Sequence, residues 1–419
     1  MASIPPRARV VLPHGGIEPR SVYDALAVSR GHPDAPPTLY TGLQFGDYGF
    51  LGPGLSGEES AIGGLGPGYR FVTWQVGPAV RHMARAGRIG VLPLRFRDIP
   101  RTFGPGGRLA ADVAVIQCAP PRDGKVNLGV SCSIFPSVVA AADLVIAEIH
   151  PDMPRTAGET DLPVSAIDLA VEATAPLGTL PRAKPDAIDE QIIAYVRKLI
   201  PDDAWVQLGV GAIPDSILGR LHEHPGIKLH SGMLTDPLIE FLDGTGRDTR
   251  VVTGEVEGSH EMYARVADDP RVTFHPTTVV HDVPHMAGLD RFVSINSAIE
   301  VDLDGQVNGE TIDGAQVSGV GGSLDFVEAA RYSRGGRSII ALRSTAKGRS
   351  RIVDRLEAGT AVTVPRHAVD VVVTEHGVAE LAALDLAGRA EALIEIADPT
   401  VRGELRARLH ERRRGAQRA

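Results

Sequence analysis

The feature that most constrains the fold is a regular alternation of two kinds of segment. Short runs rich in β-branched residues alternate with longer Ala- and Leu-rich segments that have helical spacing. The strand-like runs include RIGVLPL, DVAVIQCA, DLVIAEI, WVQLGV, RSIIALR and VDVVVT, and the helical segments include DEQIIAYVRKLI, DSILGRLHEH and SLDFVEAARYS. Alternation of this kind predicts α/β layers built on largely parallel sheets.

An internal repeat predicts that the chain consists of two related halves. The segments AVIQCAPPRDGKVNLGV and SINSAIEVDLDGQVNGE both run from an apolar strand into Asp-Gly-x-Val-Asn, at residues 123–127 and 304–308. The Asp-Gly pair is a tight-turn signal, and each copy is followed by a further apolar strand. Three prolines interrupt the pattern between Glu172 and Asp189. We therefore expect an N-terminal domain at residues 1–180 and a C-terminal domain at residues 181–419.

The composition narrows the functional class. The 419 residues carry 52 acidic and 43 basic side chains, a net charge of −9, which argues against broad nucleic-acid binding. The sequence has no run of about 18 apolar residues that would span a membrane, and its start lacks the apolar segment of a signal peptide. Cys118 and Cys132 are too few for a disulfide framework and are predicted to lie in the core. These features favour a cytoplasmic protein that binds neither nucleic acid nor membrane.

Two glycine-containing segments precede predicted helices and are candidates for ligand binding. In WVQLGVGAIPDSIL, Gly209 and Gly211 leave the backbone open at a helix N-terminus, where phosphate binds readily. The segment matches neither a dinucleotide fingerprint nor a Walker loop, so a plain tight turn fits it equally well. In QVSGVGGSLDF, Gly319, Gly321 and Gly322 expose N–H groups that suit the oxyanion formed during acyl transfer.

Acidic residues occur at the end of the strand predicted in RFVSINSAIEVDL. Glu300 and Asp302 are two residues apart, so they are predicted to share one face of that strand. On a buried face, desolvation raises a carboxyl pKa, and one of the two is then a candidate general base or nucleophile. On an exposed face they are edge charges that discourage aggregation. The sequence leaves both interpretations open.

Two further segments have weaker functional signals. His281 and His285 in HDVPH have the spacing of a metal-binding pair, but a proline lies between them and no third ligand is evident, so no metal site is predicted. The glycine-rich segment at residues 46–71 has no basic residue before Arg70 and is interpreted as a surface loop that lines or covers a substrate cleft.

The ordered motifs together resemble the acetyl-CoA hydrolase/CoA-transferase family, which includes 4-hydroxybutyrate CoA-transferase. The resemblance runs from about residue 85 and is carried by HPDMPRTAGET, QLGVGAIPDSIL, HSGMLTD, SINSAIEVDLDGQVNGE, SGVGGSLDF, GGRSIIALRSTAKGRSRI, VVVTEHGVAEL and AEALIEIADPTVRGEL. It implies two tandem, related α/β domains with mixed, largely parallel sheets. It also implies that acyl-CoA binds between the domains, in a homo-oligomer.

The same resemblance assigns the site residues. Contacts to CoA are implied for a five-residue loop, for a strand residue and for the second glycine loop: Gly209, Val210, Gly211, Ala212 and Ile213; Ile299; Gly321 and Gly322. Of these, Gly322 supplies an oxyanion-hole amide, and Ile299 brings Glu300 close to the thioester. The implied reactants are acyl-CoA and a small-molecule acceptor, without a metal.

The segment KLHSGMLTD, residues 228–236, departs from the family pattern. Family members have His-Ser/Thr-Glu-Met here, and their glutamate attacks the thioester, forms an acyl anhydride and then becomes a glutamyl-CoA thioester. This chain has Gly232 at that position. We expect Gly232 at the tip of a strand-to-helix loop, where the missing side chain leaves room for an acceptor.

Three functions are compatible with this departure. In the first, which we favour, the acyl group passes from CoA directly to an acceptor or to water, without a glutamyl-CoA intermediate. Glu300, Glu255 or Asp236 then serves as general base. In the second, Glu300 replaces the lost nucleophile and the protein is a CoA-transferase between carboxylic acids. In the third, the protein binds acyl-CoA without turning it over.

Overall fold

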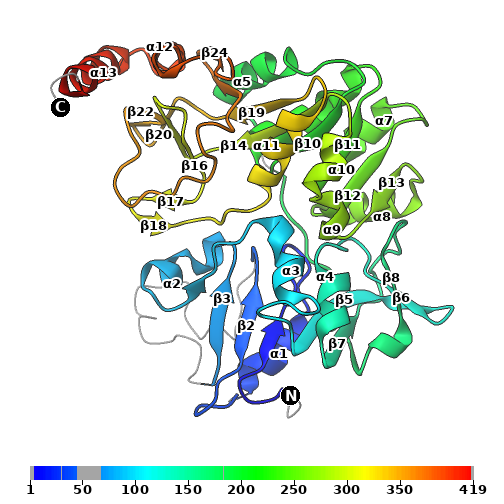
Figure 1. Cartoon of the computed structure of the whole chain (residues 1–419). Helices are drawn as coiled ribbons and strands as arrows, with labels where there is room; N and C mark the ends of the chain where they lie inside the picture. The colour runs from blue at the N-terminus through cyan, green and yellow to red at the C-terminus, as the bar shows by residue number, and fades with distance from the viewer. Residues whose placement is uncertain (1–3, 30, 45–67, 183, 417–419) are drawn as a thin grey trace.

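The computed structural model describes residues 4–29, 31–44, 68–182 and 184–416, and these form two α/β halves, each built on one large sheet (Figure 1). The glycine-rich loop predicted at residues 46–71 falls largely outside the described residues. Most neighbouring strands in both sheets are parallel, because helices connect them along the chain. The predicted fold class, tandem α/β domains with mixed and largely parallel sheets, is confirmed.

The first sheet has nine strands, and seven of them form its parallel part. In the order β4-β3-β2-β1-β5-β7-β9, these are Gly90–Val91, Arg70–Thr73, Thr38–Thr41, Arg9–Val11, Val113–Arg122, Leu144–Ile149 and Leu169–Glu172. Strand β5 also extends beyond this part into an antiparallel ribbon with β6, Lys125–Asn127, and β8, Asp161–Pro163.

The second sheet has eight strands, of which seven are parallel. Its order, β13-β12-β11-β10-β14-β19-β23-β24, corresponds to Val272–Phe274, Val251–Val256, Lys228–Leu234, Trp205–Leu208, Phe292–Ser297, Arg337–Ala341, Val371–Thr374 and Gly377–Glu380. Only the edge strand β24 runs antiparallel to its neighbour. The central strands are buried on both faces, which explains their nearly continuous apolar sequences.

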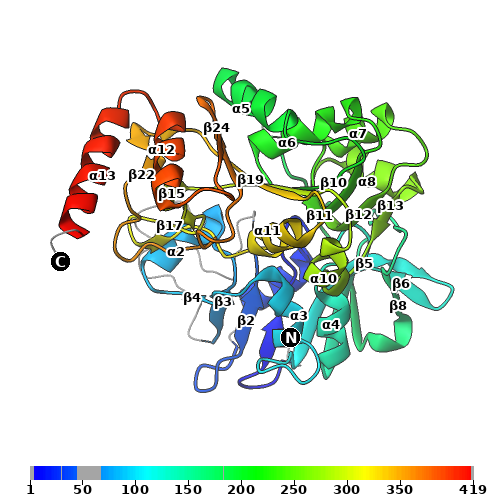
Figure 2. The same ribbon diagram turned by 45° about the horizontal axis from the view of Figure 1, so that its top comes forward.

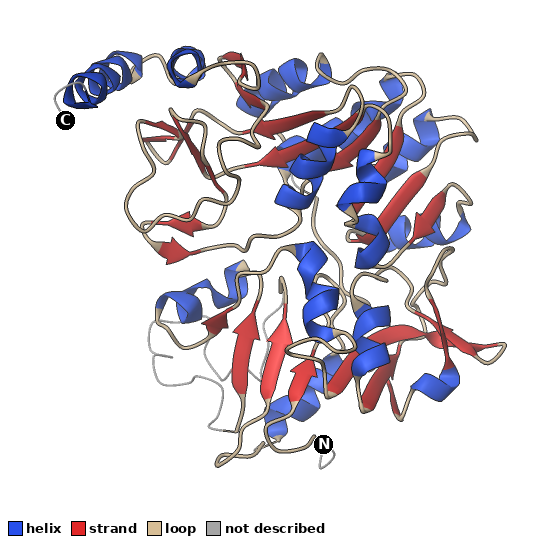
Figure 3. Ribbon diagram, viewed as in Figure 1, coloured by secondary structure: helices blue, strands red, loops and turns tan. Residues whose placement is uncertain are grey.

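Helices cover the sheets, and Figure 3 shows them distributed around both halves. Those of the first half are α1 (Arg20–Val28), α2 (Arg81–Arg85), α3 (Ile99–Phe103) and α4 (Phe135–Ala141). Those of the second half are α5 (Ala187–Arg197), α6 (Ala212–Arg220), α7 (Leu238–Gly244), α8 (His260–Asp268), α9 (Thr277–Val280), α10 (Val283–Ala287), α11 (Ser323–Tyr332), α12 (Leu386–Ile396) and α13 (Arg402–Ala416). Helices α5 and α6 pack on one face of the second sheet, and α10 and α11 on the other (Figure 2).

The strand predicted in RFVSINSAIEVDL is in fact two strands in different sheets. Strand β14 ends at Ser297, and β15, Glu300–Asp302, begins a separate three-stranded sheet with β16, Val307–Asn308, and β22, Ile352–Val353. Two small ribbons, β17–β18 and β20–β21, comprise Thr311–Ile312, Ala315–Gln316, Thr345–Ala346 and Arg349–Ser350. The prediction of a single strand was wrong because the sequence does not show where the chain leaves the large sheet.

Both copies of the Asp-Gly-x-Val-Asn repeat form antiparallel turns. In the first copy, Asp123 and Gly124 have φ angles of +51° and +72° and connect β5 to β6. In the second copy, Gly305 has a φ of +89° in the turn from β15 to β16. A left-handed turn of this kind requires glycine or a short polar residue, which explains the Asp-Gly pair.

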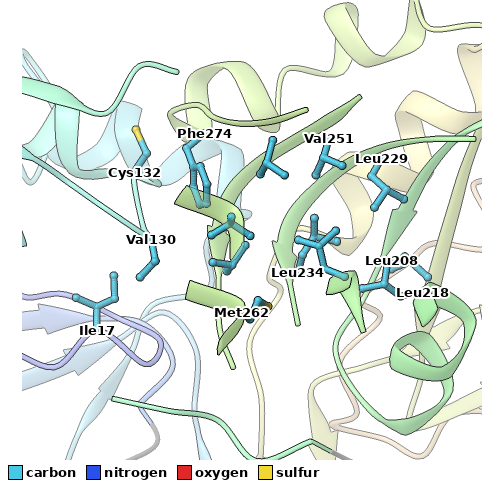
Figure 4. Close-up of a cluster of buried hydrophobic side chains, with 14 of the residues drawn as sticks. Ile17, Val130, Cys132, Leu208, Leu218, Leu229, Leu234, Val251, Met262 and Phe274 are labelled. Atoms are coloured by element: carbon cyan, nitrogen blue, oxygen red, sulfur yellow. The ribbon is translucent and has the colours of Figure 1, made fainter. Parts of the chain in front are cut away.

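One apolar core extends through both halves and fixes how they meet. Figure 4 shows Ile17 and Val130 of the first half beside Leu234 and Met262 of the second. Both cysteines are free and buried, so the prediction that they are core residues is confirmed. Among the described helices, none is long and apolar enough to cross a membrane. Since the halves bury side chains against one another, groups from each are held in fixed positions where they meet.

Candidate active site

A cavity of about 280 Å³ lies between the two halves, at the carboxyl ends of the central strands of the second sheet. This edge is where ligands bind in open parallel sheets. The first half contributes His14, Leu43, Gln75 and Phe96, and the second contributes mostly glycines, small polar residues and apolar residues. Among the described lining residues, Glu255 is the only acidic one, and none is Lys or Arg.

Gly232 lines this cavity but does not lie in a loop. It lies within β11, Lys228–Leu234, and the flanking residue Met233 pairs with Glu255 of β12. The predicted strand-to-helix loop at Gly232 is therefore wrong, since the strand continues through the glycine and α7 begins only at Leu238.

The space beside Gly232 is occupied. A Cβ atom built on Gly232 would lie 2.8 Å from Nε2 and 3.3 Å from Cε1 of His281. Contacts shorter than 3.0 Å are not tolerated by real Cβ atoms, so any side chain at position 232 would have to displace the imidazole. Gly232 itself borders the cavity, so the expectation that its missing side chain leaves room for an acceptor stays a prediction, with His281 as the nearest neighbour on that side.

The same imidazole packs against Gly322, which precedes helix α11. A Cβ atom on Gly322 would lie 2.3 Å from Cε1 and 2.9 Å from Nδ1 of His281. Gly321 has a φ of +61°, which turns the chain into the helix. The glycine loop predicted to hold an oxyanion therefore lies directly beside a histidine, and its three glycines, Gly319, Gly321 and Gly322, line the cavity.

His281 is held in one orientation by two kinds of contact, a hydrogen bond to Asp325 and packing against aromatic rings. Its Nδ1 lies 3.2 Å from Oδ2 of Asp325, a fully buried residue in the first turn of α11. Arg95 of the first half donates to Oδ1 of Asp325 at 2.7 Å. The rings of Phe96 and Phe326 lie on the imidazole, with centroids 4.8 and 4.6 Å away. No hydrogen bond to Nε2 is found within the described part of the chain.

Glu255 approaches the cavity from β12 and is held by the first half. Its Oε2 accepts a hydrogen bond from Ser131 Oγ at 3.1 Å and lies 3.4 Å from Nε2 of His14. His14 Nε2 is also 3.1 Å from Ser133 Oγ, and its ring stacks on Phe135. The carboxylate is 4% exposed, so its access is to the cavity rather than to bulk solvent.

A second carboxyl group, Glu257, is buried two residues further along the chain. It is 1% exposed and lies against the backbone of Gly15, where an added Cβ would overlap Oε1. Burial, and then the nearby Glu255, raise the pKa of Glu257 well above its ordinary value of 4.5. Neither of its oxygens finds a partner that meets hydrogen-bond geometry in the described structure. Glu257 is therefore held in a setting that favours the protonated carboxyl.

The other carboxylates predicted as bases lie elsewhere. Glu300 is absent from the lining of the cavity, and its Oε1 accepts a hydrogen bond from Asn308 Nδ2 at 2.9 Å. Ile299 does not line the cavity either, and its backbone is bonded to Asn308 and Arg351. Asp236 Oδ1 accepts bonds from the backbone and hydroxyl of Ser259, which begins helix α8.

The loop assigned to CoA reaches the same cavity only in part. Gly209 and Val210 line it, whereas Gly211, Ala212 and Ile213 continue into helix α6 without lining it. Val210 is 45% exposed, and a Cβ on Gly211 would meet nothing within 4 Å. The chain is thus uncovered at Val210 and Gly211, where α6 begins.

Sequence reasoning did not identify three of the groups that the structure brings to this site. His281 was considered only with His285 as a metal pair, and Asp325 and His14 had no assigned role. Among the described residues, no group of three or more metal-ligating side chains is found. The contact between His281 and Gly232 joins residues 49 positions apart through a short helix, and no local pattern signals it.

Comparison with protein families gives two consecutive matches. Residues 49–181 match the acetyl-CoA hydrolase/transferase N-terminal domain, and residues 258–409 match the corresponding C-terminal domain.

Individual relatives agree with these matches. The chain is 36% identical to 4-hydroxybutyrate coenzyme A transferase of Clostridium kluyveri, over 97% of this chain and 94% of that protein. It is 33% identical to succinyl-CoA:cyclohexane-1-carboxylate CoA transferase of Geobacter metallireducens, covering 85% and 82%. Among solved structures, RipA from Yersinia pestis superposes with a TM-score of 0.88 at 28% identity, covering 98% and 96%.

Proposed function

The chain belongs to the acetyl-CoA hydrolase/transferase family, and we propose that it moves an acyl group from CoA directly to a small acceptor, without a glutamyl-CoA intermediate. Family membership makes it an acyl-CoA transferase or hydrolase. The further proposal concerns which atom attacks the thioester. It assigns the attack to the acceptor rather than to a side chain of the protein.

One observation carries the proposal. Position 232 has no side chain, and the Cβ atom of any side chain there would lie 2.8 Å from Nε2 and 3.3 Å from Cε1 of His281. A nucleophile must come within about 3–3.5 Å of the carbon it attacks. The imidazole of His281 packs against both Gly232 and Gly322. Among the described residues that line the cavity, the carboxylate closest in the sheet to position 232 belongs to Glu255, on the neighbouring strand.

The chain supplies three functions to this reaction. The Gly209–Ile213 loop at the start of α6 binds the CoA portion, where helix N–H groups favour phosphate. The Gly322 amide is the donor for the oxyanion that develops on the thioester carbonyl. Glu255, fixed by Ser131 and His14, accepts a hydrogen bond from the acceptor and orients it.

Transfer between two carboxylic acids by way of Glu300 is the second candidate. The relatives named as CoA-transferases favour it, since transfer to a carboxylate is the reaction in their names. Glu300 would need to leave its bond with Asn308 and enter the cavity to serve as nucleophile.

Initial-rate kinetics test the proposal. Release of free CoA from acetyl-CoA is measured while acetyl-CoA and an acceptor are both varied, with hydroxylamine and small alcohols as acceptors. Direct attack requires both substrates to be bound together, so the double-reciprocal lines intersect. Parallel lines, the pattern of a covalent intermediate released in two half-reactions, would overturn the proposal.

A further inference from the structure

His281 has the position, orientation and support of a general base in this cavity. Its Nδ1 lies 3.2 Å from the Asp325 carboxylate, and since a carboxylate only accepts, the tautomer that suits this contact has its proton on Nδ1. In neutral imidazole the other nitrogen then carries the lone pair. That nitrogen, Nε2, is the atom directed at the Cβ position of residue 232, on the wall of the cavity.

The support behind His281 is built from both halves of the molecule. Asp325 is fully buried and is bonded by the Arg95 side chain at 2.7 Å and by the Arg97 amide at 3.1 Å. Phe96 and Phe326 fix the plane of the imidazole. A carboxylate that orients a histidine through Nδ1 is the arrangement by which hydrolases and acyltransferases activate a hydroxyl group.

The charge of the cavity indicates which acceptors it suits. Glu255 is the only charged residue among the described lining residues apart from the histidines, and no Lys or Arg is present to pair with an acidic acceptor. A carboxylate acceptor would meet Glu255 without a compensating cation, which is unfavourable in a buried site. An acceptor with an O–H or N–H group would instead donate a hydrogen bond to Glu255.

We propose that His281 is the general base of acyl transfer, and that the acceptor is an alcohol, an amine or water rather than a carboxylic acid. This inference rests on the proposed direct attack. A carboxylate acceptor is already ionised and gains nothing from a base, whereas a hydroxyl or amine must lose a proton as it attacks. The Asp325–His281 pair is therefore useful only for an acceptor that carries a proton.

The proton and the electrons balance within the two reactants. As the acceptor oxygen or nitrogen forms a bond to the thioester carbon, its proton passes to Nε2 and the carbonyl electrons move to the oxygen beside the Gly322 amide. When the carbonyl re-forms, the C–S bond breaks and the CoA thiolate takes the proton from Nε2. The products are an ester, an amide or a free acid, together with CoA, and His281 returns to its starting form.

The test uses His281→Ala in the full-length protein, with His285→Ala as the matched control. His285 is exposed on α10 and does not line the cavity. We expect His281→Ala to lower kcat with acetyl-CoA and hydroxylamine by about 10²–10⁴-fold while the KM for acetyl-CoA changes little. Added imidazole restores kcat in a saturable manner, and His285→Ala behaves like the wild type.

Further outcomes separate the base from a packing role. His281→Gln fills the space without shuttling a proton, so it is expected to be folded and inactive. Wild-type kcat in His281→Gln, or loss of activity in His281→Ala that imidazole does not restore, would overturn the role of His281. Faster formation of propionyl-CoA from acetyl-CoA and propionate than of products from hydroxylamine or alcohols would overturn the acceptor class. A wild-type protein that releases no CoA with any acceptor would instead refute the proposed function itself.

Discussion

Strands β11 and β12 are parallel neighbours that reach the same cavity, but only β12 brings a charged side chain to it. Strand β11 contributes Gly232 and the apolar Met233, whereas β12 contributes the acidic Glu255, with Glu257 buried just beyond its end. The glycine is backed by His281, and Glu255 is held by Ser131 and His14 of the other half. The comparison teaches that a glycine at position 232 does not leave the site without polar groups, because side chains of neighbouring elements supply them.

Introducing a carboxylate on β11 gives the largest expected effect. Gly232→Glu places Cβ 2.8 Å from His281 Nε2 and displaces the imidazole, so we expect kcat for CoA release to fall by about 10²–10⁴-fold. Gly246→Glu, at a position where a Cβ meets nothing within 4 Å, controls for the added charge. The double variant Gly232→Glu/His281→Ala has room for the carboxylate, and a glutamyl-CoA adduct detected by mass spectrometry is expected there alone. Full activity of Gly232→Glu would contradict this account of β11.

Removing the charge of β12 gives the next largest effect. Glu255→Gln keeps the side-chain volume but loses a charged hydrogen-bond acceptor worth about 1.5–3 kcal/mol, which corresponds to about 10–100-fold in kcat/KM for the acceptor. Glu300→Gln is the matched comparison and is expected to change kcat/KM by less than about threefold. A larger loss of kcat/KM in Glu300→Gln than in Glu255→Gln would instead identify Glu300 of β15 as the catalytic carboxylate.

Removing the ion pairs of Arg95, which join the two halves behind the cavity, is expected to have a smaller effect. Arg95→Gln removes the ion pairs with Asp325 and Glu328, and it leaves a fully buried carboxylate without its cation. We expect kcat to fall about 3–10-fold and stability to fall by about 1–3 kcal/mol, measured by steady-state kinetics and urea unfolding. Arg334→Gln, which breaks a pair on the exposed surface, is expected to leave both quantities unchanged. Equal effects of the two variants on kcat and stability would show that Arg95 does not support the active site.

The buried carboxyl beyond β12 affects stability alone. Burial raises the pKa of Glu257 above 4.5, so the folded state binds this proton more tightly than the unfolded state. Its contribution to stability is therefore complete below pH 4.5 and is lost as pH rises toward the folded-state pKa. Glu257→Gln mimics the protonated form and is expected to raise Tm by about 2–4 °C at pH 8, with a smaller difference near pH 5. The exposed Glu391→Gln serves as control, and a Glu257→Gln difference independent of pH would contradict the buried-acid interpretation.

Features of the fold that depend on local sequence patterns could be predicted from the sequence. Alternating apolar runs predicted the sheets because strand and helix periodicities are local. The Asp-Gly pairs predicted the two turns, and the structure has positive φ angles there. The Gly322 loop was recognisable because its glycines precede helix α11 within one motif.

The site itself depended on contacts that no local pattern encodes. His281 reaches Gly232 from another element, and Asp325 orients His281 from a third. The placement of Glu300 at the end of the apolar strand depended on one continuous strand, whereas the chain leaves the large sheet after Ser297 and Glu300 begins a small sheet beside Asn308.

Reductive trapping tests the central claim most directly. The wild-type protein is incubated with acetyl-CoA and borohydride in the absence of added acceptor, and its intact mass and peptides are then measured. Direct transfer predicts an unmodified protein, at Glu255 and Glu300 alike, alongside released CoA once hydroxylamine is supplied. A reduced glutamyl-CoA thioester on either residue would contradict the account.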